Sequence, residues 1–175
     1  MEETERPLIS RSFARQKLGS VGLAREDLVK ALAVVNLPGY GQANRVSYIT
    51  RRLAGVDVLV GNLALAREEG LASLRLAKEI PDYNIVASNL ALAAALAAKQ
   101  GQPIRAATLA GAAQAMYARQ HRKSWEDSSL DTLLPGWRDG PEYSAINDAF
   151  IAGQSMTAEQ AVTLALEENP AQNPA

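Results

Sequence analysis

The sequence predicts an all-α fold in which antiparallel helical hairpins stack as an α-solenoid, with a divergent helical cap at the C-terminal end. One observation is a repeat: a turn at residues 61–66, glycine first and alanine sixth, returns 40 residues later at 101–106. The glycine releases the backbone from one helix, and the small alanine lets the next approach closely. The other is composition, 47% hydrophobic but only 5% aromatic, with alanine and leucine dominant. Such periods are typical of stacked helix pairs.

One helical domain, residues 9–168, is expected between a flexible N-terminal arm at 1–8 and a flexible tail at 169–175. Glycine and proline separate apolar stretches that have helical spacing. The predicted helices are 9–18 and 24–35, the repeat pairs 44–60 with 63–80 (about 44–80) and 85–100 with 104–120 (about 84–120), and a cap at about 141–168 containing 142–153 and 158–168.

Local signals justify these elements in order. Gly19 and Pro38 end the first two helices, because neither residue favours continuation. Asn44 is an expected N-cap for the third helix. Pro103 fits the first turn of the helix that returns after the second repeat turn, where an N–H has no internal partner. In the cap, residues 157–160 match the capping box S/T-x-x-E/Q.

Charge and composition exclude several functions. Eighteen basic and nineteen acidic residues give a net charge of −1, so no direct contact with nucleic acid is expected. The chain has no cysteine and one histidine, His121, so we expect no metal site and no cofactor. The longest apolar run, residues 90–98, is too short to span a membrane, and the acidic N-terminus is unlike a secretion signal. These features predict a cytoplasmic protein.

No catalytic residues are predicted. Neighbouring carboxylates such as Glu68 and Glu69 diverge by about 100° on a helix, so they do not face each other as an acid–base pair. His121 has no serine or aspartate near it in a recognisable catalytic arrangement. Gly19 and Gly22 lack the lysine and hydroxyl partners of a phosphate-binding loop. The sequence therefore predicts a binding protein and not an enzyme.

The repeat turns resemble those of tetratricopeptide repeats, because the alanine that ends each turn is followed by small residues four and seven positions later. Residues 89–116 are similar to the last repeat of bacterial transcription activators of the LuxR and SARP type. Their ending, Ala-Phe-x-x-Gly and then Thr-x-Glu-x-Ala-Val-x-x-Ala-Leu, is matched by residues 149–166. The resemblance covers about 44–168 and implies a regulatory partner-binding arm. The small residues are Gly70, Ser73, Ala110 and Ala113.

If the repeats pack as in that family, the first helix of each pair lines a groove. A floor of small residues beside an arginine is expected to bind a protein or peptide partner, with Arg51 pairing with a carboxylate. The alternative is that Arg51 and Arg52 are solvated surface charges. The predicted groove residues are Tyr48, Arg51, Arg52, Gly55, Val58, Ser88, Ala91, Leu92 and Ala95.

Three further interpretations stay open. The polar segment 121–141 is expected to be a surface loop, in which Trp125 and Trp137 either form a second recognition surface or anchor the loop to the core. The alternative function is small-molecule sensing, with an apolar ligand between helices near Tyr48, Tyr83 and the tryptophans. Self-association through the terminal apolar faces, giving a homo-oligomer, is also left open.

Overall fold

A computed structural model describes residues 4–37, 42–79, 82–120 and 129–167 of the chain. Within these ranges every regular element is helical, which confirms the all-α prediction. No described helix is long and apolar enough to cross a membrane. The helices are α1 (Glu5–Lys17), α2 (Val21–Val35), α3 (Ala43–Val60), α4 (Leu63–Lys78), α5 (Tyr83–Lys99), α6 (Pro103–Arg119), α7 (Leu130–Leu133), the 3-10 helix η1 (Trp137–Asp139), α8 (Tyr143–Gln154) and α9 (Ala158–Leu166).

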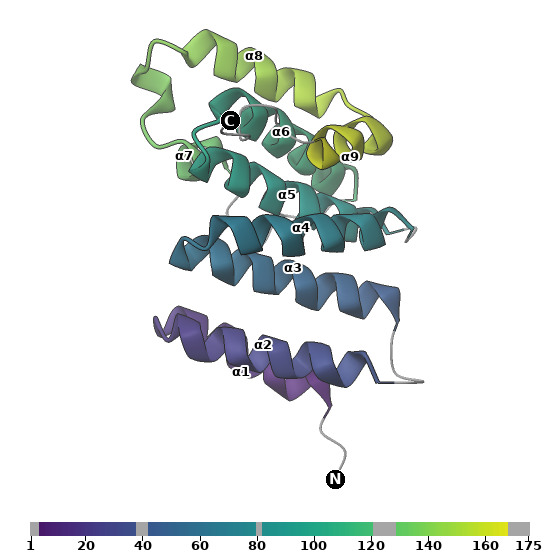
Figure 1. Ribbon diagram of the computed structural model, residues 1–175. Helices are drawn as coiled ribbons and strands as arrows, with labels where there is room; N and C mark the ends of the chain where they lie inside the picture. The colour runs from purple at the N-terminus through teal and green to yellow at the C-terminus, as the bar shows by residue number, and fades with distance from the viewer. Residues whose placement is uncertain (1–3, 38–41, 80–81, 121–128, 168–175) are drawn as a thin grey trace, which may run out of the picture.

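Three helical hairpins follow one another along the chain: α1 with α2, α3 with α4, and α5 with α6 (Figure 1). Helix α2 packs on α3, and α4 packs on α5, so the hairpins form successive layers. Helix α3 also contacts α5, which brings the first helices of two neighbouring hairpins together. At the C-terminal end α8 packs against α6, while α9 contacts α4, α5 and α6.

The two repeated turns have the same backbone conformation. Gly61 and Gly101 have φ angles of 82° and 71°, in the left-handed region that favours glycine. In each turn the next residue, Asn62 or Gln102, donates its N–H over 2.9 Å to a carbonyl in the last turn of the preceding helix. The alanine five residues after each glycine is fully buried. The repeat in the sequence is therefore a repeat of one helix-to-helix turn.

The first helix begins earlier than predicted. Helix α1 starts at Glu5, so residues 5–8 are helical and do not belong to the flexible arm expected at 1–8. Leu8 is buried, and the Glu5 carboxylate forms an ion pair with Arg45 of α3 at 2.9 Å. These contacts join residues far apart in the sequence, which is why local composition did not indicate them.

The predicted caps have mixed outcomes. Thr157 and Gln160 form the predicted capping box at the start of α9, and Pro103 occupies the first turn of α6. Asn44 was predicted as the N-cap of α3, and this is wrong because Gln42 holds that position. Part of the predicted loop at 121–141 is ordered as α7 and η1; residues 121–128 lie outside the described ranges.

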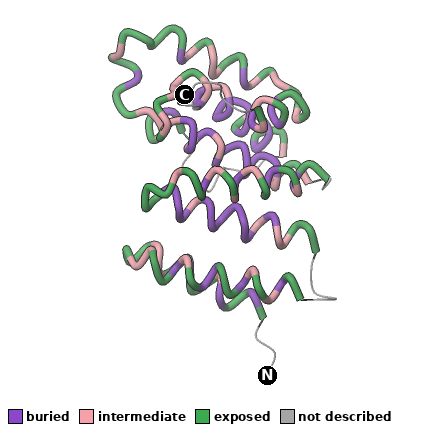
Figure 2. Tube along the Cα trace, in the orientation of Figure 1, coloured by how far each residue is buried: buried purple, intermediate pink, exposed green. Residues whose placement is uncertain are grey.

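Burial is concentrated on α3, α5 and α6, which run through the middle of the stack (Figure 2). Helices α6 and α8 approach each other closely. A Cβ atom added to Gly111 would overlap the carbonyl oxygen of Phe150, and one added to Gly153 would overlap that of Thr108. Glycine at both positions therefore allows the two helix backbones to touch, and this contact holds the cap onto the last hairpin.

Candidate binding site

A hollow of about 250 Å³ opens where α1, α3, α5 and α7 meet, and we call it the arginine hollow. Seven of the nine predicted groove residues line it together. Four of them are on α3, and the other three are alanine and leucine residues of α5. The described lining is Gln16, Arg51, Arg52, Gly55, Val58, Leu59, Ala91, Leu92, Ala95 and Leu133.

Helical spacing explains why these residues converge. On α3, Arg51, Gly55 and Val58 are separated by four and three residues, so they lie on one face. Ala91 and Ala95 are related in the same way on α5. Because α3 contacts α5, the two faces meet along one surface. Small side chains at Gly55 and on α5 leave the space that larger residues would fill.

The two arginines are buried, so the interpretation of Arg51 and Arg52 as solvated surface charges is wrong. Their exposed fractions are only 4% and 8%. The Arg51 guanidinium carbon lies 5.5 Å from the ring centroid of Tyr48, and that of Arg52 lies 5.4 Å from the ring centroid of Phe13. Cation–π contacts of this kind hold a guanidinium in place while its stem packs among apolar neighbours.

The arginine hollow also supplies an uncommitted hydrogen-bond donor. The Gln16 Nε2 atom is buried and has no hydrogen-bond partner within the described residues. None of the described residues that line the hollow is acidic. Val58, Leu92 and Leu133 provide apolar walls around these polar groups. The arrangement complements an apolar segment that carries a carboxylate, because the buried Gln16 Nε2 atom needs an acceptor and the arginines make the surface positive.

Two predicted groove residues lie elsewhere. Tyr48 lines a separate hollow with Glu5 and Ile9, although its ring also contacts the Arg51 guanidinium group. Ser88 is buried, and its hydroxyl is 2.7 Å from the Tyr117 hydroxyl of α6. Ser88 therefore fixes the packing of α5 on α6 and does not face the arginine hollow.

Trp137 belongs to the core, so it does not form a recognition surface. It is 7% exposed, stacks on Tyr143 with ring centroids 5.4 Å apart, and donates its indole N–H to Asp131 over 2.8 Å. Hydrogen bonds from Arg138 and Trp137 lower the pKa of the Asp131 carboxyl group. Trp137 thus anchors its segment, as the alternative interpretation had it. Trp125 lies outside the described residues.

Among the described residues, the aromatic side chains proposed for a small-molecule sensor do not line a common hollow. Tyr83 lines a hollow with Val86 and Val162, apart from the hollow that contains Tyr48, and Trp137 is packed against the core. In the described part of the chain no group of three or more histidine, cysteine, aspartate or glutamate side chains is placed to hold a metal ion. The arginine hollow is therefore the candidate binding site that the predicted groove residues form.

A charge cluster that the sequence did not indicate joins the first two hairpins. Arg25 of α2 donates to the fully buried Asp57 of α3 over 2.9 and 3.0 Å, and to Glu69 of α4 over 3.1 Å. Desolvation and the nearby Asp57 carboxylate raise the pKa of Glu69 to about 7, although Arg25 opposes this rise. Two carboxylates share one guanidinium, so Glu69 binds a proton more readily than usual.

We expect the free energy of unfolding to fall as the pH rises from about 4.5 to about 7. The folded-state pKa of Glu69 is above its unfolded value, so the stabilising proton is fully bound below the unfolded pKa and lost as the pH passes the folded one. Glu69→Gln should flatten this dependence, while Glu68→Gln, at an exposed neighbour, should retain it. Urea unfolding at pH 5.5 and pH 8 measures the change in the free energy of unfolding between the two pH values. An equal change for Glu69→Gln and Glu68→Gln would contradict the raised pKa of Glu69.

Comparison with models of known protein families, with curated protein sequences and with solved structures gives no match to this chain.

Proposed function

We propose that this chain is a non-catalytic protein-binding module, and that the arginine hollow captures a peptide segment with apolar side chains and one carboxylate. The observation that carries the proposal is the convergence of seven predicted groove residues on one hollow. Arg51 and Arg52 are buried residues of its lining, and no described lining residue is acidic. An extended or helical segment of a partner protein can place alternate side chains into such a surface.

We further propose that the hairpins form a solenoid of the tetratricopeptide type, acting in the cytoplasm as part of, or partner to, a bacterial transcription regulator of the LuxR or SARP type. Two turns of the same kind 40 residues apart, at Gly61 and Gly101, support the repeat architecture. Contact between α3 and α5 supports a surface built from the first helices of successive pairs. Capture of a partner segment there would shift the regulator between inactive and active states.

The bound segment is held by two kinds of contact. Its carboxylate accepts charge-assisted hydrogen bonds from the arginines that line the hollow, and Gln16 Nε2 adds a donor. Its apolar side chains displace water from Val58, Leu92 and Leu133. Small residues at Gly55 and Ala95 let the partner backbone approach α3 and α5. Affinity therefore depends on open space at Gly55 as much as on charge.

Filling the hollow at Gly55 tests this function. A Cβ atom at Gly55 meets no other atom within 4 Å, so Gly55→Leu should fold normally while occupying the hollow. Arg51→Glu is unsuitable, because Arg51 is buried and its loss would disturb the core. Gly22→Leu is the matched control, since Gly22 lies on the exposed face of α2 and also has no atom within 4 Å of an added Cβ.

The experiment selects peptides from a random display library on the wild-type protein and then measures their binding to both variants. Enriched peptides should carry an acidic residue beside apolar ones, and Gly55→Leu should weaken their binding by about tenfold or more, while Gly22→Leu should not. Peptides that bind Gly55→Leu as tightly as the wild type would refute binding in the arginine hollow.

A further inference from the structure

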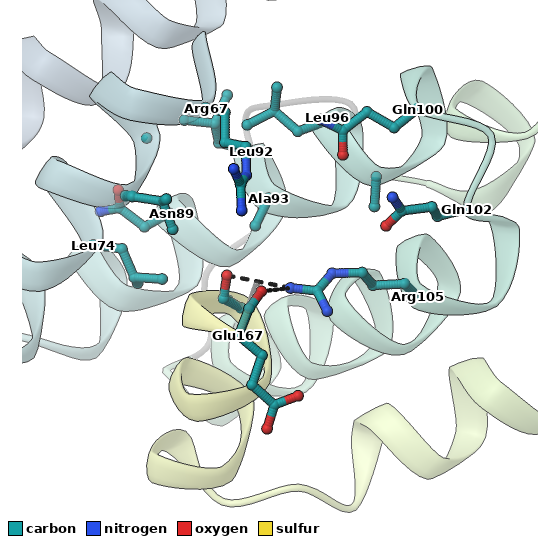
Figure 3. A pocket seen from close by; sticks show the side chains of 14 residues that line it. Arg67, Leu74, Asn89, Leu92, Ala93, Leu96, Gln100, Gln102, Arg105 and Glu167 are labelled. Atoms are coloured by element: carbon teal, nitrogen blue, oxygen red, sulfur yellow. Dashed lines mark hydrogen bonds between the residues drawn. The ribbon is translucent and has the colours of Figure 1, made fainter. Parts of the chain in front are cut away.

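A second cavity, of about 50 Å³, lies where α4, α5 and α6 meet the C-terminal end of α9, and we call it the inter-helix cavity (Figure 3). It is separate from the arginine hollow, although Leu92 contributes to both linings. Its walls combine leucine and alanine side chains with polar and charged ones, which are Arg67, Asn89, Gln100, Gln102, Arg105 and Glu167. Because it is small and mixed in polarity, it suits a compact polar ligand with a short apolar part.

Arg105 is a fixed wall of the inter-helix cavity. Its Nη2 atom donates to the carbonyl oxygens of Leu164, over 2.7 Å, and Glu167, over 3.0 Å, at the end of α9. A cation at a helix C-terminus is favourable, so this contact also secures α9. Burial and the nearby Arg67 lower the pKa of Arg105, while Glu167 raises it. Two guanidinium groups therefore share one partly enclosed space.

Arg67 has no polar partner among the described residues. It makes no hydrogen bond or ion pair in the described part of the chain, and Figure 3 shows it reaching from α4 toward the cavity. The side-chain carboxylate of Glu167 points away from it in the same view. Glu167 also lines the cavity and its charge favours the protonated form of Arg105, but no described residue supplies Arg67 with an anionic partner there. A bound anion would supply the missing partner of Arg67.

Asn89 gives an independent indication of a missing group. It is 3% exposed, and its Nδ2 atom donates to the Ile85 carbonyl over 2.9 Å. Its Oδ1 atom is buried and accepts no hydrogen bond within the described residues. A buried acceptor without a donor costs free energy, so a bound molecule that supplies an O–H or N–H group would remove that cost.

We propose that the inter-helix cavity binds a small carboxylic acid anion that carries a hydroxyl or amino group next to its carboxylate. The planar guanidinium of Arg67 matches a carboxylate through two parallel hydrogen bonds. The neighbouring hydroxyl or amino group donates to Asn89, and a short carbon chain contacts Leu71 and Leu96. A volume of about 50 Å³ holds only a few water molecules, which excludes nucleotides and peptides from its interior.

Lactate is the probe, and propionate, which lacks the hydroxyl, is its matched comparison. Arginine Nε–H resonances of the full chain are followed by NMR while sodium lactate replaces sodium chloride at constant ionic strength. We expect a saturable shift of the Arg67 resonance, with propionate binding more weakly. Arg67→Gln should reduce the affinity for lactate by about tenfold or more. Arg75→Gln, at an exposed site on the same helix, should leave it unchanged.

Ala93→Leu provides a second test, because it fills the cavity and keeps both arginines. It should abolish the saturable shift, while Gly55→Leu, in the arginine hollow, should retain it, so this proposal and the proposed function fail separately. Lactate binding no tighter than chloride binding, or equal binding by Arg67→Gln and the wild type, would overturn the proposal.

Discussion

Gly111→Ala is expected to destabilise the protein by about 3 kcal/mol, because the added methyl group has no room. Its carbon would overlap the Phe150 carbonyl oxygen and stand 3.2 Å from the Gln154 nitrogen, and both are backbone atoms that no rotamer change can move. Helix α8 must therefore separate from α6. Thermal unfolding followed by circular dichroism should show a Tm lower by roughly 10 °C. Gly153→Ala, on the facing helix, should behave in the same way.

Gly70→Ala is the matched control for this prediction. Gly70 is also a buried helical glycine, but an added Cβ would make ordinary contacts, with the nearest atom, Leu92 Cδ2, at 3.4 Å. Alanine has the higher helix propensity, so Gly70→Ala should be neutral or stabilise by about 0.5–1 kcal/mol. An unchanged Tm for Gly111→Ala would show that α8 does not pack on α6 as closely as described.

Asp27→Asn is expected to cost about 2 kcal/mol of stability, by separating α1 from α2. Asp27 is fully buried and accepts from Arg11 over 2.7 and 3.0 Å and from Arg15 over 2.7 Å. The magnitude is at the lower end for a buried ion pair because Arg11 is about half exposed, at 52%. Asparagine keeps the shape of the side chain but removes the charge. Unfolding in guanidinium chloride therefore measures the electrostatic contribution of Asp27 to the free energy of unfolding.

The Asp27 carboxylate should also make the free energy of unfolding decrease at low pH. A hydrogen bond from Arg11, with the charges of Arg11 and Arg15, lowers the pKa of Asp27. Its stabilising effect is complete above the unfolded-state pKa and is lost as the pH falls through the lower, folded-state value. Asp27→Asn should remove this loss, and Asp148→Asn, on the exposed face of α8, should not. If both variants match the wild type at every pH, the ion pairs do not hold α1 to α2.

Much of the fold follows from local signals, because helices end where glycine or proline interrupts an apolar pattern. The turns at Gly61 and Gly101 were predicted from spacing alone, and so was the capping box at Thr157. The start of α1 was not, since Glu5 is ordered through Arg45, a residue of another hairpin. Nor did the sequence reveal that Gly111 meets α8, because which face of a helix is crossed depends on tertiary packing.

The candidate site could likewise be predicted only where local spacing determines it. Spacing within one helix placed Arg51, Gly55 and Val58 on one face, and the hairpin repeat placed Ala91 and Ala95 opposite them. The contributions of α1 and α7 come from segments far away in the chain, so sequence patterns could not include them. Arg52 also contacts Phe13 of α1, which sequence patterns could not reveal. The inter-helix cavity was missed for a similar reason, because α9 closes it against three earlier helices.

Binding of a peptide in the arginine hollow is tested most directly by mapping where a selected peptide contacts the protein. Methyl resonances are assigned in the wild-type chain, and the peptide enriched by display is added. The account predicts shifts at Ala91, Ala95, Val58 and Leu133, which line the arginine hollow, and little change at Leu23 or Val29, which are exposed on α2. Shifts confined to α2, or a saturated complex with no change at the arginine hollow, would contradict it.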